Sequence, residues 1–213
     1  MTEKLYESDA YLKEFDAKVL EIIGDKIVLD KTCFFARAGG QVADTGEING
    51  TKVVDVFEED SKIYHVLERE PDFKVGDLVH GKIDWERRYR IMKLHSAAHL
   101  VYFLMEKLFP GCKPASAGLI DDKKARTDYF LPRKPTPEEM KAIEERVNKI
   151  IEMDLEIKRW KEGDKLFWKV DLFPEMLCCG THVKRTSEIG KIAVKVGKKP
   201  GKGKERIEIT LVE

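Results

Sequence analysis

The chain has 213 residues, of which 42% are hydrophobic, so it can bury the core of one large domain or of two small ones. Its 39 Lys and Arg residues balance 39 Asp and Glu residues, which excludes a bulk polycation but allows a local basic patch. The first residues, "MTEKLYESDAYLKEF", lack an apolar signal core, and no apolar run approaches the roughly 18 residues of a membrane helix, so we expect a cytoplasmic protein.

Residues 18–84 show the patterns of short β-strands. Two apolar runs in "KVLEIIGDKIVLD" flank a turn at "GDK", which predicts a hairpin, and "TKVVDVFEED" with "KIYHVLE" predicts a second hairpin around "EEDSK". The segment "GDLVHGKID" alternates its side chains in the rhythm of a further strand. Several short strands separated by turns favour a small β-barrel over this region.

The pattern changes to helical at Trp85. Apolar residues recur at helical spacing over residues 91–108, and the "PG" that follows ends this helix. A second helix is predicted to begin at Pro137, with Thr136 as its N-cap and Glu139 completing a capping box.

The remaining segments predict strands. "LEIKRWKE" reads as one strand, and "GKIAVKVGKK" with "KERIEITLVE" reads as a closing hairpin. We therefore predict an α+β protein of two domains. Residues 1–84 would form a small N-terminal β-barrel, and residues 85–213 would form a mixed domain with an antiparallel sheet and helices.

Two short motifs carry metal-binding chemistry. His95 and His99 in "HSAAH" are four residues apart, so both project from one face of the predicted helix. Cys178 and His182 in "CCGTH" have the same spacing around a small Gly-Thr pair. Three imidazoles and one thiol form a typical zinc ligand set, and a reducing compartment disfavours disulfides between the cysteines of the chain.

Other interpretations of these residues stay open. A helical His pair also occurs as packed core residues, and a single Cys-x-x-x-His pair is a weak signal by itself. Cys179 is an alternative thiol ligand, since it lies three residues before His182. Ser96 follows the first His at the position where a zinc peptidase helix carries its Glu general base, so a zinc peptidase is disfavoured. His65 and His80 fall within strand patterns and are interpreted as ordinary strand residues.

Taken together, these motifs resemble those of a known family. "HSAAH", "CCGTH" and the following "VKRTSEIGKIAVKV" resemble the editing domain of alanyl-tRNA synthetase and its free-standing relatives, the AlaX proteins. "FFARAGGQVADTGEI" resembles the glycine-rich motif of the longer AlaX class, and "ARTDYF" and "ERIEITL" resemble two further family segments. The family's Thr-x-Glu-Ile-Gly stretch is matched by Thr186, Glu188, Ile189 and Gly190.

The resemblance implies both a fold and an activity. The fold would be a translation-protein-like small β-barrel with the glycine-rich loop, followed by an α+β editing domain that holds Zn²⁺ on His95, His99, Cys178 and His182. The activity would be hydrolysis of the ester on mischarged tRNA(Ala), with Ser-tRNA(Ala) as the chief substrate and Gly-tRNA(Ala) as a second one. Since 213 residues leave no room for an aminoacylation domain, the protein would act in trans to support translation fidelity.

Polar side chains near these motifs are candidates for contact with the substrate. A site that demands a hydrogen bond from the serine hydroxyl can discriminate against alanine, which lacks it. The candidates are Thr181, Ser96 and Gln41, and the resemblance implies that Gly39 and Gly40 form a loop that faces the site. The alternatives are a turn residue for Thr181, a hydrogen bond back along its helix for Ser96, and a plain turn at the two glycines.

A basic segment near the C-terminus is the candidate for contact with the phosphates of the tRNA acceptor end. The predicted contacts are Lys198, Lys199, Lys202 and Lys204 of "KVGKKPGKGKER" together with Arg126, and Arg87, Arg88 and Arg90 could extend this surface. We expect Asp128 to pair with Arg126. A solvated hairpin tip is the alternative interpretation of the segment.

Two other function classes stay open. One is a non-catalytic tRNA-binding module with a structural zinc, which would leave the ester intact. The other is a zinc hydrolase of a small ester or amide, which would not need the basic segment.

Overall fold

The computed structural model describes residues 2–115, 118–201 and 203–212. The chain divides into two compact units, one of Met1–Ala38 with Val42–Tyr89 and the other of Gly39–Gln41 with Arg90–Glu213. The division falls inside the long helix α2 (Trp85–Leu108), a few residues beyond the sequence-predicted boundary. The α+β class with mostly antiparallel sheets is confirmed.

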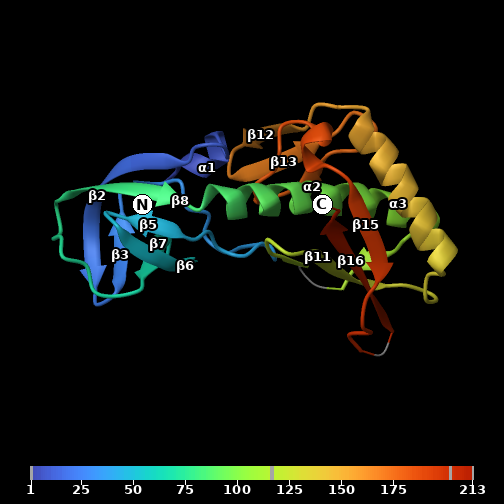
Figure 1. Cartoon of the computed structure of the whole chain (residues 1–213), viewed down its shortest axis with the longest axis horizontal. Coiled ribbons are helices and arrows are strands. Elements are labelled where there is room, and N and C mark those ends of the chain that lie inside the picture. The colour runs from blue at the N-terminus through green and yellow to red at the C-terminus, as the bar shows by residue number, and fades with distance from the viewer. Residues whose placement is uncertain (1, 116–117, 202, 213) are drawn as a thin grey trace. The chain divides into compact units, whose positions relative to one another are not determined.

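Six antiparallel strands of the first unit close into a barrel in the order β2-β3-β7-β6-β5-β8 (Figure 1). Both sequence-predicted hairpins are present, since Ile23 pairs with Lys26 across the first turn and Glu59 pairs with Lys62 across the second. The short strand β1 (Glu3–Lys4) leads into α1 (Leu5–Ser8) and pairs with β4 (Lys31–Thr32). The barrel strands are β2 (Glu14–Ile23), β3 (Lys26–Leu29), β5 (Gly46–Ile48), β6 (Thr51–Glu59), β7 (Lys62–Leu67) and β8 (Leu78–Ile83).

The barrel is filled by the apolar side chains that alternate along its strands. On β2, Phe15, Ala17 and Val19 are buried, whereas the residues between them are exposed. Such alternation places one face of each strand in the core, and each large apolar side chain that is buried contributes about 1.5–3 kcal/mol. His65 of β7 is also fully buried, and its Nε2 lies 2.8 Å from the Thr32 hydroxyl.

The first turn of α2 is fixed to the first unit by a buried ion pair. Arg88 is completely buried, and its Nε donates to Asp44 Oδ1 at 2.8 Å. Its two terminal nitrogens donate to the backbone carbonyls of Ala10 at 3.0 Å and Cys33 at 2.7 Å. The expectation that Arg88 extends an RNA-binding surface is therefore wrong, because its guanidinium is consumed inside the protein.

The second unit combines two sheets with helical segments. A five-stranded sheet has the order β10-β11-β16-β15, with β9 pairing with β11, and β12, β13 and β14 form a smaller sheet (Figure 1). The strands are β9 (Lys113–Pro114), β10 (Leu119–Ile120), β11 (Ala125–Phe130), β12 (Lys158–Glu162), β13 (Lys165–Lys169), β14 (Met176–Leu177), β15 (Ile192–Val196) and β16 (Lys204–Leu211). The remaining helical segments are α3 (Pro137–Glu152) and the short 3₁₀ turn η1 (Thr186–Ile189).

Helix α2 is the central core helix of the second unit. Its residues from Ile91 to Met105 are buried almost all round, not only along the predicted apolar stripe. Among the described residues, no helix is both long and apolar enough to be a membrane-span candidate. A helix buried on all sides within a protein core can hold polar side chains away from bulk water, and α2 does so with His95 and His99.

Helix α3 begins as the sequence predicts. The Thr136 hydroxyl accepts from Glu139 N at 3.2 Å, and the Glu139 carboxylate accepts from Thr136 N at 2.8 Å, which completes the capping box. The helix then packs on β15, where the Asn148 amide bonds both the N–H and the carbonyl of Ile192 at 2.9 and 3.0 Å.

Candidate metal centre

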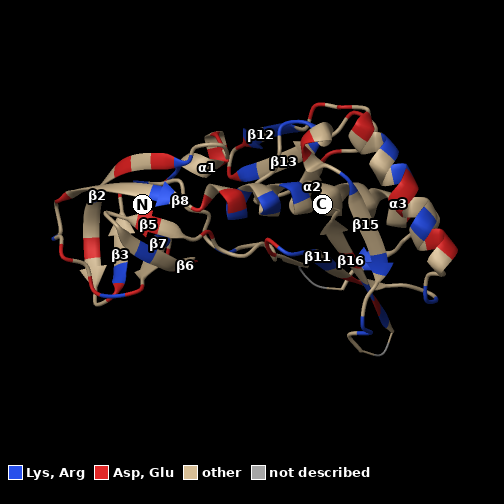
Figure 2. Ribbon diagram, viewed as in Figure 1, with Lys and Arg blue, Asp and Glu red and all other residues tan. Residues whose placement is uncertain are grey.

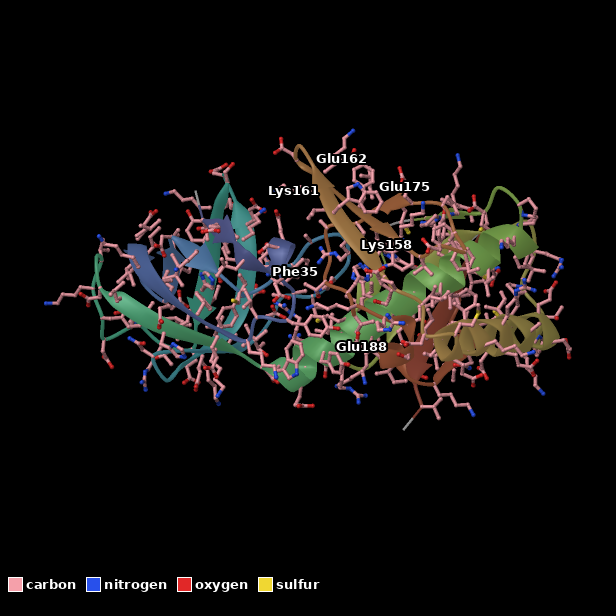
Figure 3. The ribbon with its side chains drawn as sticks, turned by 90° about the horizontal axis from the view of Figure 1, so that it is seen from above. Phe35, Lys158, Lys161, Glu162, Glu175 and Glu188 are labelled. Atoms are coloured by element: carbon pink, nitrogen blue, oxygen red, sulfur yellow. The ribbon has the colours of Figure 1, made fainter. Side chains whose placement is uncertain are left out.

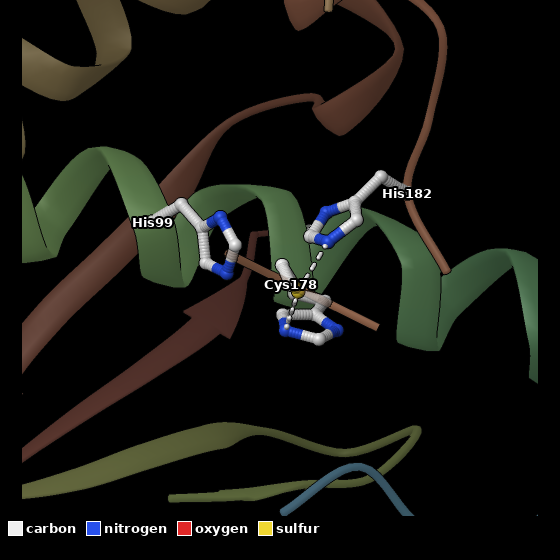
Figure 4. A group of neighbouring side chains, drawn as sticks. His99, Cys178 and His182 are labelled. Atoms are coloured by element: carbon white, nitrogen blue, oxygen red, sulfur yellow. Dashed lines mark hydrogen bonds between the residues drawn. The ribbon is translucent and has the colours of Figure 1, made fainter. Parts of the chain in front are cut away.

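Helix α2 and the loop after β14 bring four possible metal ligands together. The ligand atoms of His95, His99, Cys178 and His182 all lie within 4.8 Å of one another (Figure 4). The two helical imidazoles come from successive turns of α2, and their rings meet edge to face at 4.9 Å. This cluster could bind a metal ion, and we call it the ligand cluster.

Two distances inside the ligand cluster are close to those around a tetrahedral ion. Zn–N bonds near 2.05 Å and Zn–S bonds near 2.3 Å at tetrahedral angles place S and N ligand atoms about 3.5 Å apart. In the structure Cys178 Sγ lies 3.5 Å from His95 Nε2 and 3.1 Å from His182 Nε2. His99 Nδ1 is buried and has no hydrogen-bond partner among the described residues, a cost that a bound ion or water would relieve.

A hydrogen-bond network fixes the tautomer of His95. The backbone N–H of Thr181 donates to Gln41 Oε1 at 2.9 Å, so this amide oxygen is an acceptor. His95 Nδ1 lies 2.8 Å from the same oxygen and must therefore carry its proton. Gln41 Nε2 in turn donates to the Thr181 hydroxyl at 2.9 Å. The lone pair of His95 is thus left on Nε2, which faces Cys178, as metal-binding imidazoles are commonly held.

The Ser96 hydroxyl fixes the tautomer of His182. Its hydroxyl donates to the carbonyl of Met92 at 2.9 Å, one turn back along α2, as the alternative interpretation expected. The same oxygen lies 3.1 Å from His182 Nδ1 and accepts that proton, and it also accepts from Val183 N at 3.3 Å. The lone pair of His182 is therefore left on Nε2, toward Cys178.

Thr181, Ser96 and Gln41 were predicted as substrate contacts. Thr181 and Ser96 are completely buried and Gln41 is 2% exposed, with their polar atoms engaged around the ligand histidines. These geometries give all three residues a positioning role. Substrate contact by them stays a prediction.

The glycine-rich loop reaches the site by close backbone approach. Gly39–Gln41 belongs to the second unit, not to the barrel to which the sequence assigned this loop. The reason is local, because the Gly40 carbonyl accepts from Ile120 N at 2.9 Å and Gln41 bonds to Thr181. A Cβ on Gly40 would lie 2.1 Å from the carbonyl oxygen of Gly118, so only glycine fits there.

Burial sets the protonation states of the ligand cluster. Desolvation lowers the pKa of His99 to about 3, and it holds the pKa of His95 and of His182 well below the usual range. The positive charge of Arg159 lowers the pKa of all three imidazoles further. All three imidazoles are therefore neutral at pH 7, as metal ligands must be. Desolvation raises the pKa of the Cys178 thiol to about 12, so this thiol is protonated at pH 7 and a metal ion that binds it displaces the proton.

Cys179, the alternative thiol, lies outside the ligand cluster. Its side chain is exposed, and its Sγ would lie 3.4 Å from a Cβ placed on Gly39. Cys178 is half-buried and within reach of two histidines. The geometry therefore favours Cys178 as the ligand.

Sequence reasoning missed Arg159 and Trp168. These residues stand opposite each other on β12 and β13, and the Trp168 ring packs edge to face on His99 with centroids 4.7 Å apart. The strand alternation of "KRWKE" and "KLFWK" could have placed both on one face. It could not have shown that this face lies against the ligand cluster.

The family stretch beginning at Thr186 has a structural role. The buried Thr186 hydroxyl accepts from Leu155 N at 2.8 Å and donates to the Ile150 carbonyl at 3.1 Å, so it ties η1 to the end of α3. The Glu188 carboxylate accepts from the backbone N–H groups of Lys184 and Arg185. These contacts fix the backbone that follows His182.

The lysines predicted to contact tRNA differ in exposure and in the side chains that they contact. Lys198 is exposed, Lys199 pairs with Glu205 at 2.7 Å, and Lys204 lies over the Phe130 ring at 5.4 Å. Lys202 lies outside the described residues. Figure 2 shows basic residues around the β15–β16 turn.

Arg126 stands on β11, opposite Glu208 of β16. The expected pairing of Asp128 with Arg126 is wrong, because Asp128 binds Arg206 in a bidentate pair at 2.7 and 2.9 Å. The two strands place Asp128 and Arg206 directly opposite each other.

Two family models match separate parts of the chain. Residues 6–87 match the model for class II (A) tRNA synthetases, and residues 163–208 match the model for the second additional domain of threonyl and alanyl tRNA synthetases. The second match contains two of the four residues of the ligand cluster.

Full-length relatives extend the similarity over the whole chain. The alanyl-tRNA editing protein AlaX-M of Pyrococcus horikoshii is 39% identical over 99% of this chain and 98% of its own length. The AlaX-M protein of Saccharolobus solfataricus is 33% identical over 99% of both chains. The alanine–tRNA ligase of Ignicoccus hospitalis is 33% identical over 97% of this chain but only 26% of its own length.

Proposed function

The chain belongs to the AlaX-M alanyl-tRNA editing proteins, and we propose that it is a trans-editing aminoacyl-tRNA deacylase. Its substrate is the ester that links a wrong amino acid to tRNA(Ala). Ser-tRNA(Ala) is the chief substrate, and Gly-tRNA(Ala) is a second one. Such a protein works in the cytoplasm, beside translation.

The observation that carries this proposal is the ligand cluster. Three neutral imidazoles and one thiol converge there, and two of the imidazoles are oriented by Gln41 and Ser96. This donor set favours zinc over the harder ions that prefer oxygen ligands. We therefore assign Zn²⁺ to His95, His99, Cys178 and His182.

The residues of the chain hold and shape the site. When bound, zinc polarises an ester carbonyl and makes a nearby water more acidic. Gln41 and Ser96 keep the Nε2 lone pairs of His95 and His182 directed inward, and the Trp168 ring excludes water from one side of His99. We infer that Thr181 takes part in selecting serine. A site that forms a hydrogen bond with the serine hydroxyl discriminates against alanine, which has no hydroxyl.

The tRNA itself needs phosphate contacts. We propose that the basic segment, consisting of Lys198, Lys199, Lys202 and Lys204, holds the acceptor end together with Arg126. We also propose that the chain consists of a translation-protein-like barrel domain and a zinc-containing editing domain. The barrel's six antiparallel strands support the first assignment and the ligand cluster supports the second.

A second candidate function is a tRNA-binding module with a structural zinc. It is favoured by the four protein ligands, because structural zinc sites are typically closed by four while catalytic sites keep an open position. In that case tRNA would bind and the ester would survive.

The experiment that separates the two follows release of labelled serine from Ser-tRNA(Ala), beside Gly-tRNA(Ala) and Ala-tRNA(Ala). For an editing enzyme we expect fast release of serine with alanine spared, loss of activity with a chelator, and recovery with zinc. His99→Ala should abolish release, whereas His80→Ala, at an exposed imidazole paired with Asp16, should not. Tight tRNA binding by the zinc-loaded protein without any release would favour the structural-zinc module.

The basic segment has its own test. Replacing Lys198, Lys199 and Lys202 by Ala should weaken tRNA binding and lower the salt slope by about one for each phosphate that these lysines no longer neutralise. An unchanged rate on mischarged tRNA would instead favour a hydrolase of small esters.

A further inference from the structure

The small sheet of β12, β13 and β14 has two chemically different faces. Residues directly opposite each other in a sheet share a face, and successive residues alternate between faces. Arg159 pairs with Trp168, which is completely buried against His99 of the ligand cluster. This face is therefore the inner one.

The outer face carries three apolar side chains in a row across the strands. Trp160 stacks on Phe167 with ring centroids 5.3 Å apart and planes 11° apart, and Phe167 stands opposite Leu177. Trp160 and Phe167 are only half-buried, and Leu177 is 58% exposed. The indole N–H of Trp160 donates to Glu162 at 2.8 Å, which holds the ring in place. We call Trp160, Phe167 and Leu177 the aromatic platform.

Lysines surround the aromatic platform on the same face. Register places Lys158 opposite Lys169, and Lys165 opposite Glu162, at the two ends of the hairpin. Lys158 also pairs with Asp171 at 3.0 Å, beyond the end of β13. Three lysines share the face with Glu162, and Figure 3 shows Lys158 and Glu162 toward opposite ends of the hairpin. Because Asp171 neutralises Lys158, the three lysines leave one net positive charge against the two carboxylates, which favours an anionic ligand.

The aromatic platform is continuous with the ligand cluster along the chain. Leu177, its last member, directly precedes Cys178, and the backbone N–H of Cys178 still bonds the Leu166 carbonyl at 2.9 Å. Leu177 shares the outer face with Phe167, whereas the thiol of Cys178, the residue after β14, lies 3.5 Å from His95 Nε2 and 3.1 Å from His182 Nε2. β14 is an edge strand of this sheet, and no described strand pairs with its other side.

Many proteins bind unpaired nucleotides on a sheet face that exposes aromatic rings among lysines. The bases stack on the rings, and the lysines bind the phosphates. A protein partner fits less well, since lysine is depleted in protein–protein interfaces. We propose that the aromatic platform stacks the unpaired nucleotides at the 3′ end of the tRNA, while the aminoacylated terminal ribose enters the ligand cluster past β14. The identity of this RNA as a tRNA rests on the function proposed above.

The test compares two substrates that differ in their unpaired nucleotides. Seryl-adenosine carries the ester on the terminal nucleoside alone, whereas Ser-tRNA(Ala) carries the whole single-stranded end. Loss of one stacked base costs about 5- to 150-fold in binding. Trp160→Ala should therefore lower kcat/KM on Ser-tRNA(Ala) by that factor and leave seryl-adenosine hydrolysis unchanged. Trp160→Phe keeps a stacking ring and should retain most of the rate.

Met153→Ala is the matched control, because it removes an apolar side chain that is 53% exposed elsewhere in the same unit, and it should change neither rate. Zinc content and circular dichroism verify that each variant is folded and loaded. A folded Trp160→Ala protein with the wild-type rate on Ser-tRNA(Ala) would overturn the proposal. An equal loss on both substrates would also overturn it, since Trp160 would then act by supporting the ligand cluster.

Direct binding separates this proposal from the proposed function. A fluorescein-labelled single-stranded RNA ending in CCA should bind the wild-type chain and bind Trp160→Ala about 5- to 150-fold more weakly, whether or not any ester is cleaved. Absence of Ser-tRNA(Ala) cleavage by the wild type would reject the proposed function alone. Equal affinity of wild type and Trp160→Ala for the RNA would reject the aromatic platform alone.

Discussion

Gly180 is the position where one added methyl group should destroy the ligand cluster. A Cβ at this residue would lie 2.1 Å from His95 Cε1, 2.5 Å from His95 Nδ1 and 2.7 Å from Gln41 Oε1. Ordinary carbon–carbon contacts begin near 3.5 Å, so in Gly180→Ala the imidazole must retreat by about 1.4 Å. Metal–ligand bonds tolerate about 0.2 Å, so His95 should cease to be a ligand. The same methyl group also breaks the Gln41 contact that orients the ring.

We expect zinc affinity to fall at least about 100-fold, because disturbing the partners of a ligand already costs 10- to 100-fold. Overpacking should also lower the free energy of unfolding by about 1–3 kcal/mol. Competition with a chromophoric chelator measures the affinity, and denaturant unfolding measures the stability. Gly24→Ala is the control, since it places a methyl group at a positive φ of 59° with no atom within 4 Å and should keep wild-type zinc affinity. Stoichiometric zinc at wild-type affinity in Gly180→Ala would refute the reasoning.

Further predictions concern the thiols, the supporting amide and a buried barrel histidine. Cys178→Ala should lose metal and activity, whereas Cys179→Ala should keep both. If metal analysis instead finds that Cys179→Ala loses the metal and Cys178→Ala retains it, Cys179 is the ligand. Gln41→Leu removes the acceptor of the His95 proton and should weaken zinc binding by about 10- to 100-fold in a chelator competition, so an unchanged affinity would contradict the positioning role. Burial lowers the pKa of His65 from 6.5 to about 4, so the unfolded state takes up its proton first as the pH falls. The contribution of neutral His65 to the free energy of unfolding is therefore fully present above pH 6.5. It is lost as the pH falls toward 4, by up to about 3 kcal/mol. His65→Gln should show a smaller loss in urea unfolding between pH 7.5 and pH 5, and an equal loss would show that other groups control the acid response.

Local sequence patterns determined most of the secondary structure. The hairpin turn before Lys26, the start of α2 at Trp85 and the capping box at Thr136 each follow from residues that are neighbours in the chain. The two halves of the ligand cluster were also visible, because an i, i+4 pair of histidines must share one face of a helix. Spacing alone, however, could not choose between Cys178 and Cys179.

Tertiary structure decided which polar residues serve the ligands. Gln41 reaches His95 and Thr181 across 54 and 140 residues, and such a contact is fixed by packing, which no local pattern encodes. The pairing of Asp128 with Arg206, and not with Arg126, likewise follows from strand register between β11 and β16. The sequence by itself thus determined the chemistry available at the site. Only the fold decided how each donor is oriented, because the directions of lone pairs depend on partners that are brought close by the burial of distant segments.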